Sequence, residues 1–317
     1  MTNVQKKSPA KRNKTITLSL KEEIALSKQA VKFGPQKPLP NIKNQVIWQD
    51  TFYALRFIPD NSVDLMIVDP PYNLTKIFGK NVFRQTDMES YRRWLDKWLC
   101  KTVRILKPNA SIYICSDWKT SLIIPQVASK YFILRNRISW EREKGRAAAN
   151  NWKNCLEDIW FFTKSDTYTF NLNAVKIQRP VLAPYRDTGG KPKDWNEQNG
   201  SKTRLTAPSN IWTDITVPFW SMAENTDHPT QKPEKLMAKL ILASSNAGDL
   251  VFDPFSGSGT TAVVAQKLGR NFLCIERERK YVALTFKRLQ AAATDSHIQG
   301  YENGVFKSRN SISDKNA

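Results

Sequence analysis

The feature that most constrains the fold of this 317-residue chain is a short apolar run, residues 63–68, that ends at Asp69-Pro70-Pro71-Tyr72. The run is rich in β-branched residues and is closed by prolines, which predicts a buried strand of a parallel sheet. Asp69 would then lie at the carboxyl end of that strand, where open α/β sheets bind their ligands. The segment therefore brings a carboxylate, two prolines and an aromatic ring to a ligand-binding edge.

The Asp69–Tyr72 segment offers hydrogen-bond acceptors and a flat ring. Two consecutive prolines fix φ and lack backbone N–H groups, so the backbone there presents only carbonyl oxygens. The Asp69 carboxylate, the Pro70 carbonyl and the Tyr72 ring together suit a planar amine that is held through its hydrogens. Taken alone, the segment is equally well explained as a simple turn, because Asp and Pro are common turn residues.

A second junction between a strand and a loop lies near the end of the chain. Residues 248–252 predict a buried strand that runs into Asp253-Pro254-Phe255-Ser256-Gly257-Ser258-Gly259, and a helix over 262–268 opens from that loop. The next strand, 271–276, ends at Glu276. Glycines there allow a ligand to approach the backbone closely, and the acid can bond ribose hydroxyls. The loop lacks a third glycine and a Walker lysine, so neither a dinucleotide nor ATP is the natural ligand.

Strands and helices alternate along most of the chain, which predicts an α/β fold with a doubly wound parallel sheet. Further strands are expected at residues 45–50, 111–115, 132–140 and 159–163, and further helices at 18–31, 91–106, 121–131 and 234–245. Residues 1–15 are polar and basic and are expected to be disordered. The polar chain after about residue 293 is expected to fray.

The net charge of +20 indicates a polyanionic partner, with nucleic acid ahead of a membrane surface. Residues 176–204 concentrate this charge, with seven Lys or Arg, three acidic residues and three prolines in an irregular segment that also carries Tyr185 and Trp195. Contact with nucleic-acid phosphates is the functional interpretation. A solvated loop is the alternative. The candidate DNA-binding residues are Arg186, Lys191, Lys193, Lys202 and Arg204.

The remaining composition excludes several classes of protein. The four cysteines (Cys100, Cys115, Cys155 and Cys274) show no metal-ligand spacing, so we expect no metal and a buried structural place for each. No apolar run reaches transmembrane length, and the first residues lack a signal sequence, which predicts a cytoplasmic protein that does not contact a membrane.

Together, Asp69-Pro70-Pro71-Tyr72 and Asp253-Pro254-Phe255-Ser256-Gly257-Ser258-Gly259 resemble the DNA amino-methyltransferases that use S-adenosylmethionine. The catalytic motif comes first and the cofactor loop last, as in the permuted beta group of that family, which includes methylases of type II restriction-modification systems. His228-Pro229-Thr230-Gln231-Lys232-Pro233 also resembles the segment that precedes the cofactor loop in this group. The likeness covers roughly residues 46–289. It implies a Rossmann-like methyltransferase sheet with an irregular target-recognition insertion.

The resemblance implies a role for individual residues of this chain. Phe255, Ser256, Gly257 and Gly259 would surround the methionine part of the cofactor, and Asp253 would support their loop. Thr230 and Lys232 would hold the cofactor's carboxylate, Glu276 its ribose hydroxyls, and Asp50 the amino group of its adenine. Asp69, Pro70, Pro71 and Tyr72 would form the catalytic motif.

The expected reaction is methyl transfer to an exocyclic amine of a base flipped out of the duplex. Asp69 and the Pro70 carbonyl would accept the two amine hydrogens, and Tyr72 would stack on the base. Adenine N6 is the first expectation, because Asp in the first motif position is more common among adenine enzymes. Cytosine N4 is the nearest alternative, and RNA is a further alternative substrate. A nucleic-acid-binding protein without catalysis is the alternative from a different class. No cysteine follows a proline, which disfavours cytosine C5 methylation.

The same resemblance suggests a division of the chain and a set of partners. Residues 1–44 would be a basic tail and linker, 45–165 the catalytic half, 166–225 the target-recognition region, 226–293 the cofactor-binding half and 294–317 a polar tail. Double-stranded DNA is the expected partner, a homodimer is reasonable, and a cognate restriction endonuclease could act on the same site.

Overall fold

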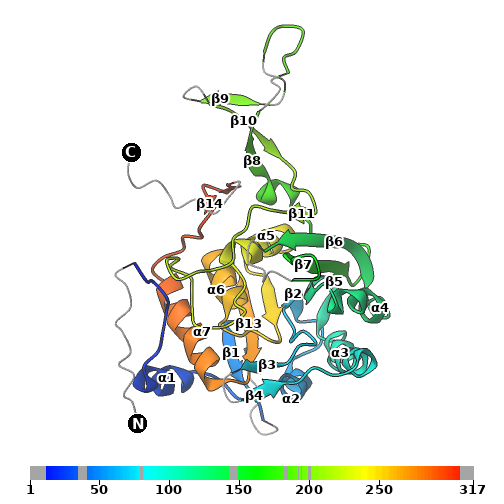
Figure 1. The fold of residues 1–317 in the computed structure, drawn as a ribbon, viewed down its shortest axis with the longest axis vertical. Helices are drawn as coiled ribbons and strands as arrows, with labels where there is room; N and C mark the ends of the chain where they lie inside the picture. The colour runs from blue at the N-terminus through cyan, green and yellow to red at the C-terminus, as the bar shows by residue number, and fades with distance from the viewer. Residues whose placement is uncertain are drawn as a thin grey trace.

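The buried apolar runs of the sequence form a central eight-stranded sheet with helices on both faces (Figure 1). The computed structural model describes residues 12–34, 41–78, 81–142, 149–181, 185–191, 193, 195–198 and 201–307. The helices are α1 (Leu20–Ser27), α2 (Thr51–Ala54), α3 (Met88–Thr102), α4 (Ile124–Ala128), α5 (Glu234–Ser244), α6 (Thr260–Lys267) and α7 (Arg279–Ala292), with short 3-10 turns at Leu55–Phe57, Thr120–Leu122 and Leu172–Val175. The strands of the central sheet are β1 (Gln45–Trp48), β2 (Val63–Val68), β5 (Leu106–Asp117), β6 (Ile133–Glu141), β7 (Leu156–Thr163), β11 (Ile211–Trp212), β12 (Leu250–Asp253) and β13 (Asn271–Glu276).

The strand order is β1-β13-β12-β2-β5-β7-β6-β11, and every neighbouring pair is parallel except the two that involve β7. The doubly wound α/β fold expected from the sequence is confirmed. The expectation of a wholly parallel sheet was wrong at β7, because β6 and β7 are joined as a hairpin and must therefore run in opposite directions.

Side chains that alternate along each central strand divide the core into two layers. Leu65, Cys115 and Cys274 face the layer of α5, α6 and α7. Met66 and Ile114 face the layer of α2, α3 and α4. Both layers are apolar, so the strands read as nearly continuous hydrophobic runs in the sequence. Each large side chain that is fully buried in this way contributes about 1.5–3 kcal/mol relative to an exposed one.

Four neighbouring strands end in acids at one edge of the sheet. In sheet order, Asp50 follows β1, Glu276 ends β13, Asp253 ends β12 and Asp69 follows β2. β13 and β1 lie on one side of β12, and β5 lies on the other side of β2. Asp253 and Asp69 therefore lie at the point where the strand order reverses. This is where doubly wound sheets open a crevice for ligands.

The basic segment, residues 176–204, forms part of a second, smaller sheet that projects from one end of the molecule (Figure 1). Its order is β14-β15-β8-β10-β9, built from β8 (Ile177–Pro180), β9 (Asn196–Gln198), β10 (Ser201–Thr206), β14 (Tyr301–Glu302) and β15 (Val305–Phe306). A third, two-stranded sheet pairs β3 (Lys76–Phe78) with β4 (Asn81–Phe83). The expectation of an irregular segment was therefore wrong for β8, β9 and β10. These strands are short and polar, and their sequences show no clear apolar alternation.

Residues 294–307 are ordered, where fraying was expected, and the rest of the polar tail lies outside the described residues. Phe306 pairs with Ile177 in a parallel bridge and is fully buried. The Lys307 carbonyl accepts a hydrogen bond from Lys235 Nζ at 2.7 Å. Burial of one aromatic ring and pairing of the backbone stabilise this short segment, although most of its sequence is polar.

The predicted N-terminal helix is confirmed as α1, shorter than expected. Ser19 caps it in a capping box with Glu22. Its Glu23 pairs with Arg279 of α7 at 2.7 Å, while Leu20 and Ile24 stay exposed. The helix is therefore docked on the core largely through its charged residues. The expected disorder of residues 1–15 falls mostly outside the described residues, but Lys14 N–H donates to the Trp220 carbonyl at 2.7 Å.

Cysteine burial was predicted correctly for only two of the four. Cys115 and Cys274 are buried in the core, whereas Cys100 is exposed and Cys155 is half-buried. Cys100 lies on the outer face of α3, a position that its apolar sequence neighbours did not reveal. None of the helices in the described part of the chain is long and apolar enough to cross a membrane.

Candidate active site

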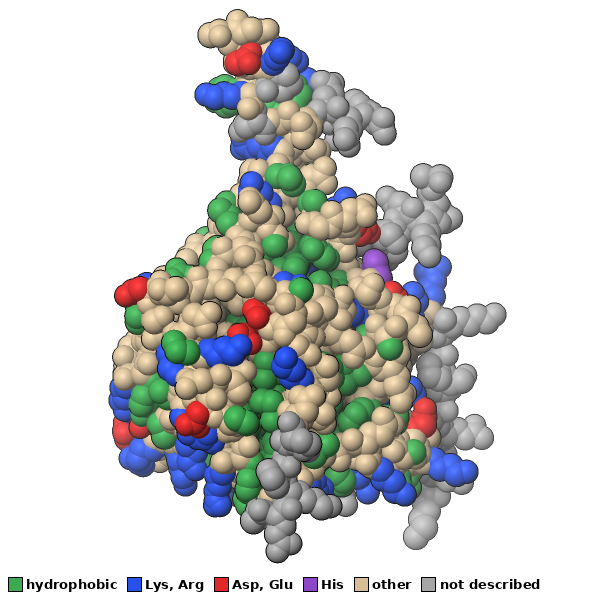
Figure 2. Space-filling view, turned by 180° about the vertical axis from the view of Figure 1, so that it is seen from behind, with side chains coloured by type: hydrophobic (Ala, Val, Ile, Leu, Met, Phe, Trp, Pro, Cys, Tyr) green, Lys and Arg blue, Asp and Glu red, His purple; other side chains and the backbone are tan. Residues whose placement is uncertain are grey.

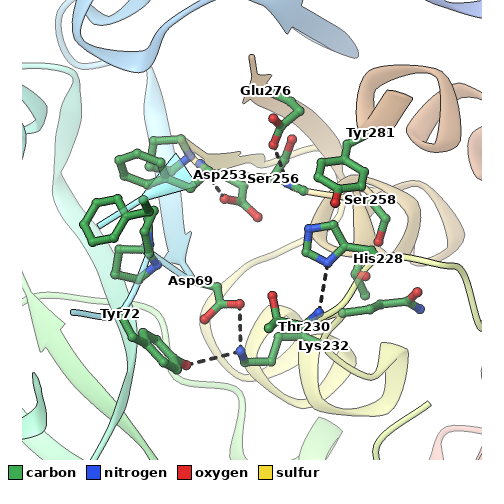
Figure 3. A pocket seen from close by; sticks show the side chains of 18 of the residues that line it. Asp69, Tyr72, His228, Thr230, Lys232, Asp253, Ser256, Ser258, Glu276 and Tyr281 are labelled. Atoms are coloured by element: carbon green, nitrogen blue, oxygen red, sulfur yellow. Dashed lines mark hydrogen bonds and ion pairs between the residues drawn. The ribbon is translucent and has the colours of Figure 1, made fainter. Parts of the chain in front are cut away.

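The acids at the carboxyl ends of these strands line one cavity, together with the Asp69–Tyr72 segment and the glycine loop (Figure 3). Of the residues that the sequence singled out for catalysis or cofactor binding, the cavity wall includes Asp50, Asp69, Pro70, Pro71, Tyr72, Thr230, Lys232, Asp253, Phe255, Ser256, Gly257 and Glu276. Gly259 lies behind the wall, at the start of α6. Segments that are distant in the sequence are thus brought to one place.

The glycine loop needs its glycines for both conformation and space. Gly257 and Gly259 have φ of +50° and +75°, values that residues with a side chain rarely adopt. A Cβ atom on Gly257 would lie 2.8 Å from His228 Nε2, and one on Gly259 would collide with the Thr285 side chain. The loop is therefore packed tightly from behind and leaves its other side to the cavity.

Asp253 holds this loop in place. Its Oδ1 accepts the Phe255 N–H at 3.0 Å, and its Oδ2 accepts the Thr261 hydroxyl at 2.6 Å. Burial raises the pKa of Asp253 to about 7. Both oxygens are occupied by protein donors, so the carboxylate ties the start of the loop to the first turn of α6.

Glu276 and Asp50 lie on the same side of the cavity as the loop. Glu276 accepts the N–H groups of Gly257, Arg277 and Glu278 at 2.8–2.9 Å, and desolvation raises its pKa to about 7. Asp50 is exposed and caps α2 by accepting the Tyr53 N–H at 3.3 Å. Two fixed carboxylates can therefore accept hydrogen bonds from hydroxyl or amino groups of a ligand.

Asp69 lies opposite the loop and is held from one side only. Its Oδ2 accepts Lys232 Nζ at 2.7 Å. Its Oδ1 is buried, and among the described residues no donor contacts it. Asn73 and Tyr91 fix the turn that follows, since the Asn73 side chain bonds the Thr86 backbone and the Tyr91 hydroxyl donates to the Pro71 carbonyl at 3.1 Å. One carboxylate oxygen of Asp69 is therefore buried without a hydrogen-bond donor from the described residues.

Lys232 lies among carboxylates and not at the loop. Its ammonium contacts Asp69 Oδ2, the Tyr72 hydroxyl at 3.2 Å and Glu157 Oε2 at 3.2 Å. Burial alone would lower the pKa of Lys232, but the two carboxylates outweigh it and raise that pKa above its ordinary value. The sequence suggested that Lys232 holds the cofactor's carboxylate, and this role stays a prediction. In this structure the Lys232 ammonium forms ion pairs with Asp69 and Glu157.

Thr230 and His228 form the wall beneath the loop. The Thr230 N–H donates to His228 Nδ1 at 3.3 Å, and the His228 ring meets the Tyr281 ring edge-on at 4.4 Å. Desolvation lowers the pKa of His228 to about 3, so the ring is neutral at physiological pH. Its packing against Gly257 makes it part of the loop's support.

Sequence reasoning missed several residues of the cavity wall. Trp94 of α3 lines the cavity, and the centroid of its ring lies 5.9 Å from that of the Phe255 ring. Phe52, Lys76, Arg142, Glu157 and Tyr281 also line it. Trp94 follows the apolar face of an amphipathic helix, and Glu157 begins a strand, so neither position carries a local signal of a site.

The candidate DNA-binding residues lie on or beside the projecting sheet. Arg186 and Lys202 place their charges 5.2 and 5.5 Å from the buried Trp195 ring. Lys191 and Lys193 are exposed, and Arg204 is half-buried on β10. Figure 2 shows Lys and Arg side chains on this projection and around the edge of the body. In the described part of the chain, no group of three or more His, Cys, Asp or Glu side chains could hold a metal ion.

Comparison with known proteins matches residues 63–287 to the DNA methylase family of N6 and N4 methyltransferases. The DNA adenine methyltransferase YhdJ of Escherichia coli (strain K12) is 34% identical over 276 residues, covering 85% of this chain and 89% of that protein. The type II methyltransferase M.HpaI of Haemophilus parainfluenzae is 33% identical, covering 81% of this chain and 76% of that protein.

Solved structures agree with this assignment. The complex of M1.HpyAVI with SAM has a TM-score of 0.53 at 25% identity, covering 77% of this chain and 98% of that chain. The cytosine-N4-specific PvuII DNA methyltransferase has a TM-score of 0.57 at 18% identity, covering 80% and 92%, which shows a shared fold. The match spans most of the chain and includes both motifs, and this protein therefore belongs to the DNA methylase family.

Proposed function

We propose that this protein transfers a methyl group from S-adenosylmethionine to N6 of adenine in double-stranded DNA, at a specific sequence. Support comes from the family, from a relative named as an adenine methyltransferase at 34% identity, and from Asp in the first position of the Asp-Pro-Pro-Tyr motif. The observation that carries the proposal is the buried Asp69 Oδ1, which has no donor among the described residues.

The cavity fits S-adenosylmethionine through the residues that face it. The Gly257 backbone would lie against the methionine part, with Gly259 behind it, Glu276 would accept the ribose hydroxyls, and Asp50 would accept the adenine amino group. Phe255 and Trp94 supply an aromatic wall. When bound, the cofactor supplies an electrophilic methyl group, so the protein need not provide a covalent nucleophile. The chain's own task is to hold and orient the acceptor amine.

The catalytic motif fits an exocyclic amine. The lone pair of such an amine is delocalised into the base, so the amine is a poor nucleophile. Asp69 Oδ1 and the Pro70 carbonyl would accept its two hydrogens, favour the form with the lone pair freed, and stabilise the positive charge that develops on nitrogen. A buried acceptor without a partner costs about 1–3 kcal/mol, and the incoming amine would remove that cost.

Access to this site requires that the base leave the duplex. Tyr72 lies beside Asp69 and would stack on the extruded base, a contact that is typically worth about 1–3 kcal/mol. The projecting sheet, with Arg186, Lys191, Lys193, Lys202 and Arg204, would contact the DNA backbone and groove. A homodimer, a cognate restriction endonuclease and a cytoplasmic location remain predictions from the sequence.

The test is methyl transfer from labelled S-adenosylmethionine to unmethylated genomic DNA, followed by nucleoside analysis of the product. We expect label in N6-methyladenine. Label in N4-methylcytosine would keep the family and mechanism but overturn the choice of base. Label in neither nucleoside, with DNA binding intact, would contradict the proposed activity and favour RNA as substrate or a protein without catalysis.

A further inference from the structure

Glu157 is a buried carboxylate of the active-site wall to which the mechanism above gives no part. It lies near the start of β7, paired with Asp117 of β5 and Trp140 of β6, and its side chain is 5% exposed. A buried carboxylate is costly unless it is paired, so its partners indicate what it does.

Both oxygens of Glu157 are engaged with residues around the catalytic motif. Its Oε2 accepts the Tyr72 hydroxyl at 3.1 Å and the Lys232 ammonium at 3.2 Å. Its Oε1 pairs with Arg142 at 2.6 Å, at the end of β6. Glu157 thus contacts the residue expected to stack on the base, and also the cation that holds Asp69.

The contact with Lys232 decides which oxygen of Asp69 is left without a donor. Lys232 pairs with both Asp69 and Glu157, and it bonds Asp69 through Oδ2. Figure 3 shows this bond, with the other Asp69 oxygen turned away from the ammonium. Without Glu157, the buried ammonium would have Asp69 as its one remaining carboxylate partner among the described residues. It could then shift toward Asp69 and compete with a substrate amine for both oxygens.

The contact with Tyr72 fixes the ring. A tyrosine that lines a cavity can turn about χ1 and χ2, and stacking on a base requires one of those orientations. The hydroxyl is anchored by Glu157 as acceptor and by Lys232 as donor. The ring plane is therefore set before a base arrives.

We propose that Glu157 is a positioning residue for the target base: through Lys232 and the Tyr72 hydroxyl it fixes the acceptor oxygen of Asp69 and the plane of the stacking ring. This inference rests on the proposed function and adds a residue that acts on the base-binding side of the cavity, not on the cofactor side.

The next residue provides a matched control. Asp158 is also buried on β7, but strand alternation turns it to the other face, where it pairs with Arg137 at 2.8 Å and accepts the Ser121 hydroxyl at 2.6 Å. Asp158→Asn and Glu157→Gln each remove one buried negative charge from the same strand. A purely structural role would give both variants the same phenotype.

The experiment measures melting temperature, kcat and the KM for S-adenosylmethionine of the full-length protein, with unmethylated genomic DNA as substrate. For Glu157→Gln we expect kcat to fall on the order of 100-fold with an unchanged KM, since misplacement by about 1 Å has effects of that size. For Asp158→Asn we expect kcat close to wild type, even if its melting temperature falls. Tyr72→Phe keeps the ring but loses the hydroxyl that bonds Glu157 and Lys232, and it should also lower kcat.

Several results would overturn the inference. These are a kcat near wild type for Glu157→Gln, equal losses of kcat in Glu157→Gln and Asp158→Asn, or a raised KM with kcat unchanged. If Glu157→Gln does not fold, Tyr72→Phe decides, and a wild-type kcat in that variant contradicts the anchoring role. Failure of the proposed function is distinguishable, because the wild-type protein would then transfer no methyl group to DNA.

Discussion

Asp253 and Asp69 end neighbouring strands of one sheet, but their carboxylates are held in different ways. Asp253 is 4% exposed, and protein donors occupy both of its oxygens. Asp69 has one oxygen on Lys232 and the other buried without a donor among the described residues. A saturated carboxylate stabilises a loop, whereas a half-saturated one is ready for a ligand. The contrast separates the proposed cofactor side of the cavity from the proposed base side, although both strands end in Asp-Pro.

On the cofactor side, Gly259→Ala has the largest expected effect. The new methyl group would meet Thr285 at a φ of +75°, so the loop must move. Strained backbone of this kind costs on the order of 1–3 kcal/mol before any steric clash is counted. We expect loss of S-adenosylmethionine binding, measured by calorimetry, together with a lower melting temperature. Gly269→Ala is the control: its φ is +71°, but nothing lies near its Cβ. Equal binding losses in both variants would contradict the steric argument.

A smaller effect, on the free energy of unfolding, is expected from Asp253→Asn, and this effect should depend on pH. The folded-state pKa of about 7 lies above the ordinary value of 3.8, so the folded protein binds more protons than the unfolded chain between those values. The contribution of Asp253 to stability is therefore greatest below about pH 4 and falls as the pH rises toward 7. Denaturant unfolding of wild type and variant at several pH values should show a difference in free energy that shrinks across this range. A difference that grows with pH would contradict the burial argument.

The smallest effect is expected far from both carboxylates, on the projecting sheet. Lys193→Ala removes one exposed charge and should weaken DNA binding, lowering the slope of log K against log salt by about 1. Lys21→Ala, on α1 at the opposite end of the molecule (Figure 1), should leave the slope unchanged. A changed slope for Lys21 and an unchanged one for Lys193 would place the DNA on another surface.

Sequence patterns predicted the parts of this molecule that depend on local order. The buried strands, the strand-ending acids and the glycine loop are each visible in a few consecutive residues, and the structure brings them together. The reversal of β7, the pairing of Phe306 with Ile177 and the placement of Glu157 beside Tyr72 depend on contacts between distant segments. A charged residue at the start of a strand reads as solvent-exposed, and only the tertiary fold shows that Glu157 is buried among partners.

The most direct test of the central claim is a single-turnover comparison of wild type and Asp69→Asn, with S-adenosylmethionine binding and DNA binding measured in parallel. The variant keeps the shape of the side chain and removes the charge that, in the proposed mechanism, faces the base. We expect methyl transfer to fall by at least on the order of 10²–10³-fold, the usual effect of removing one such electrostatic contact, while both binding constants change little. Transfer at the wild-type rate would show that the free oxygen of Asp69 is not where the amine is held.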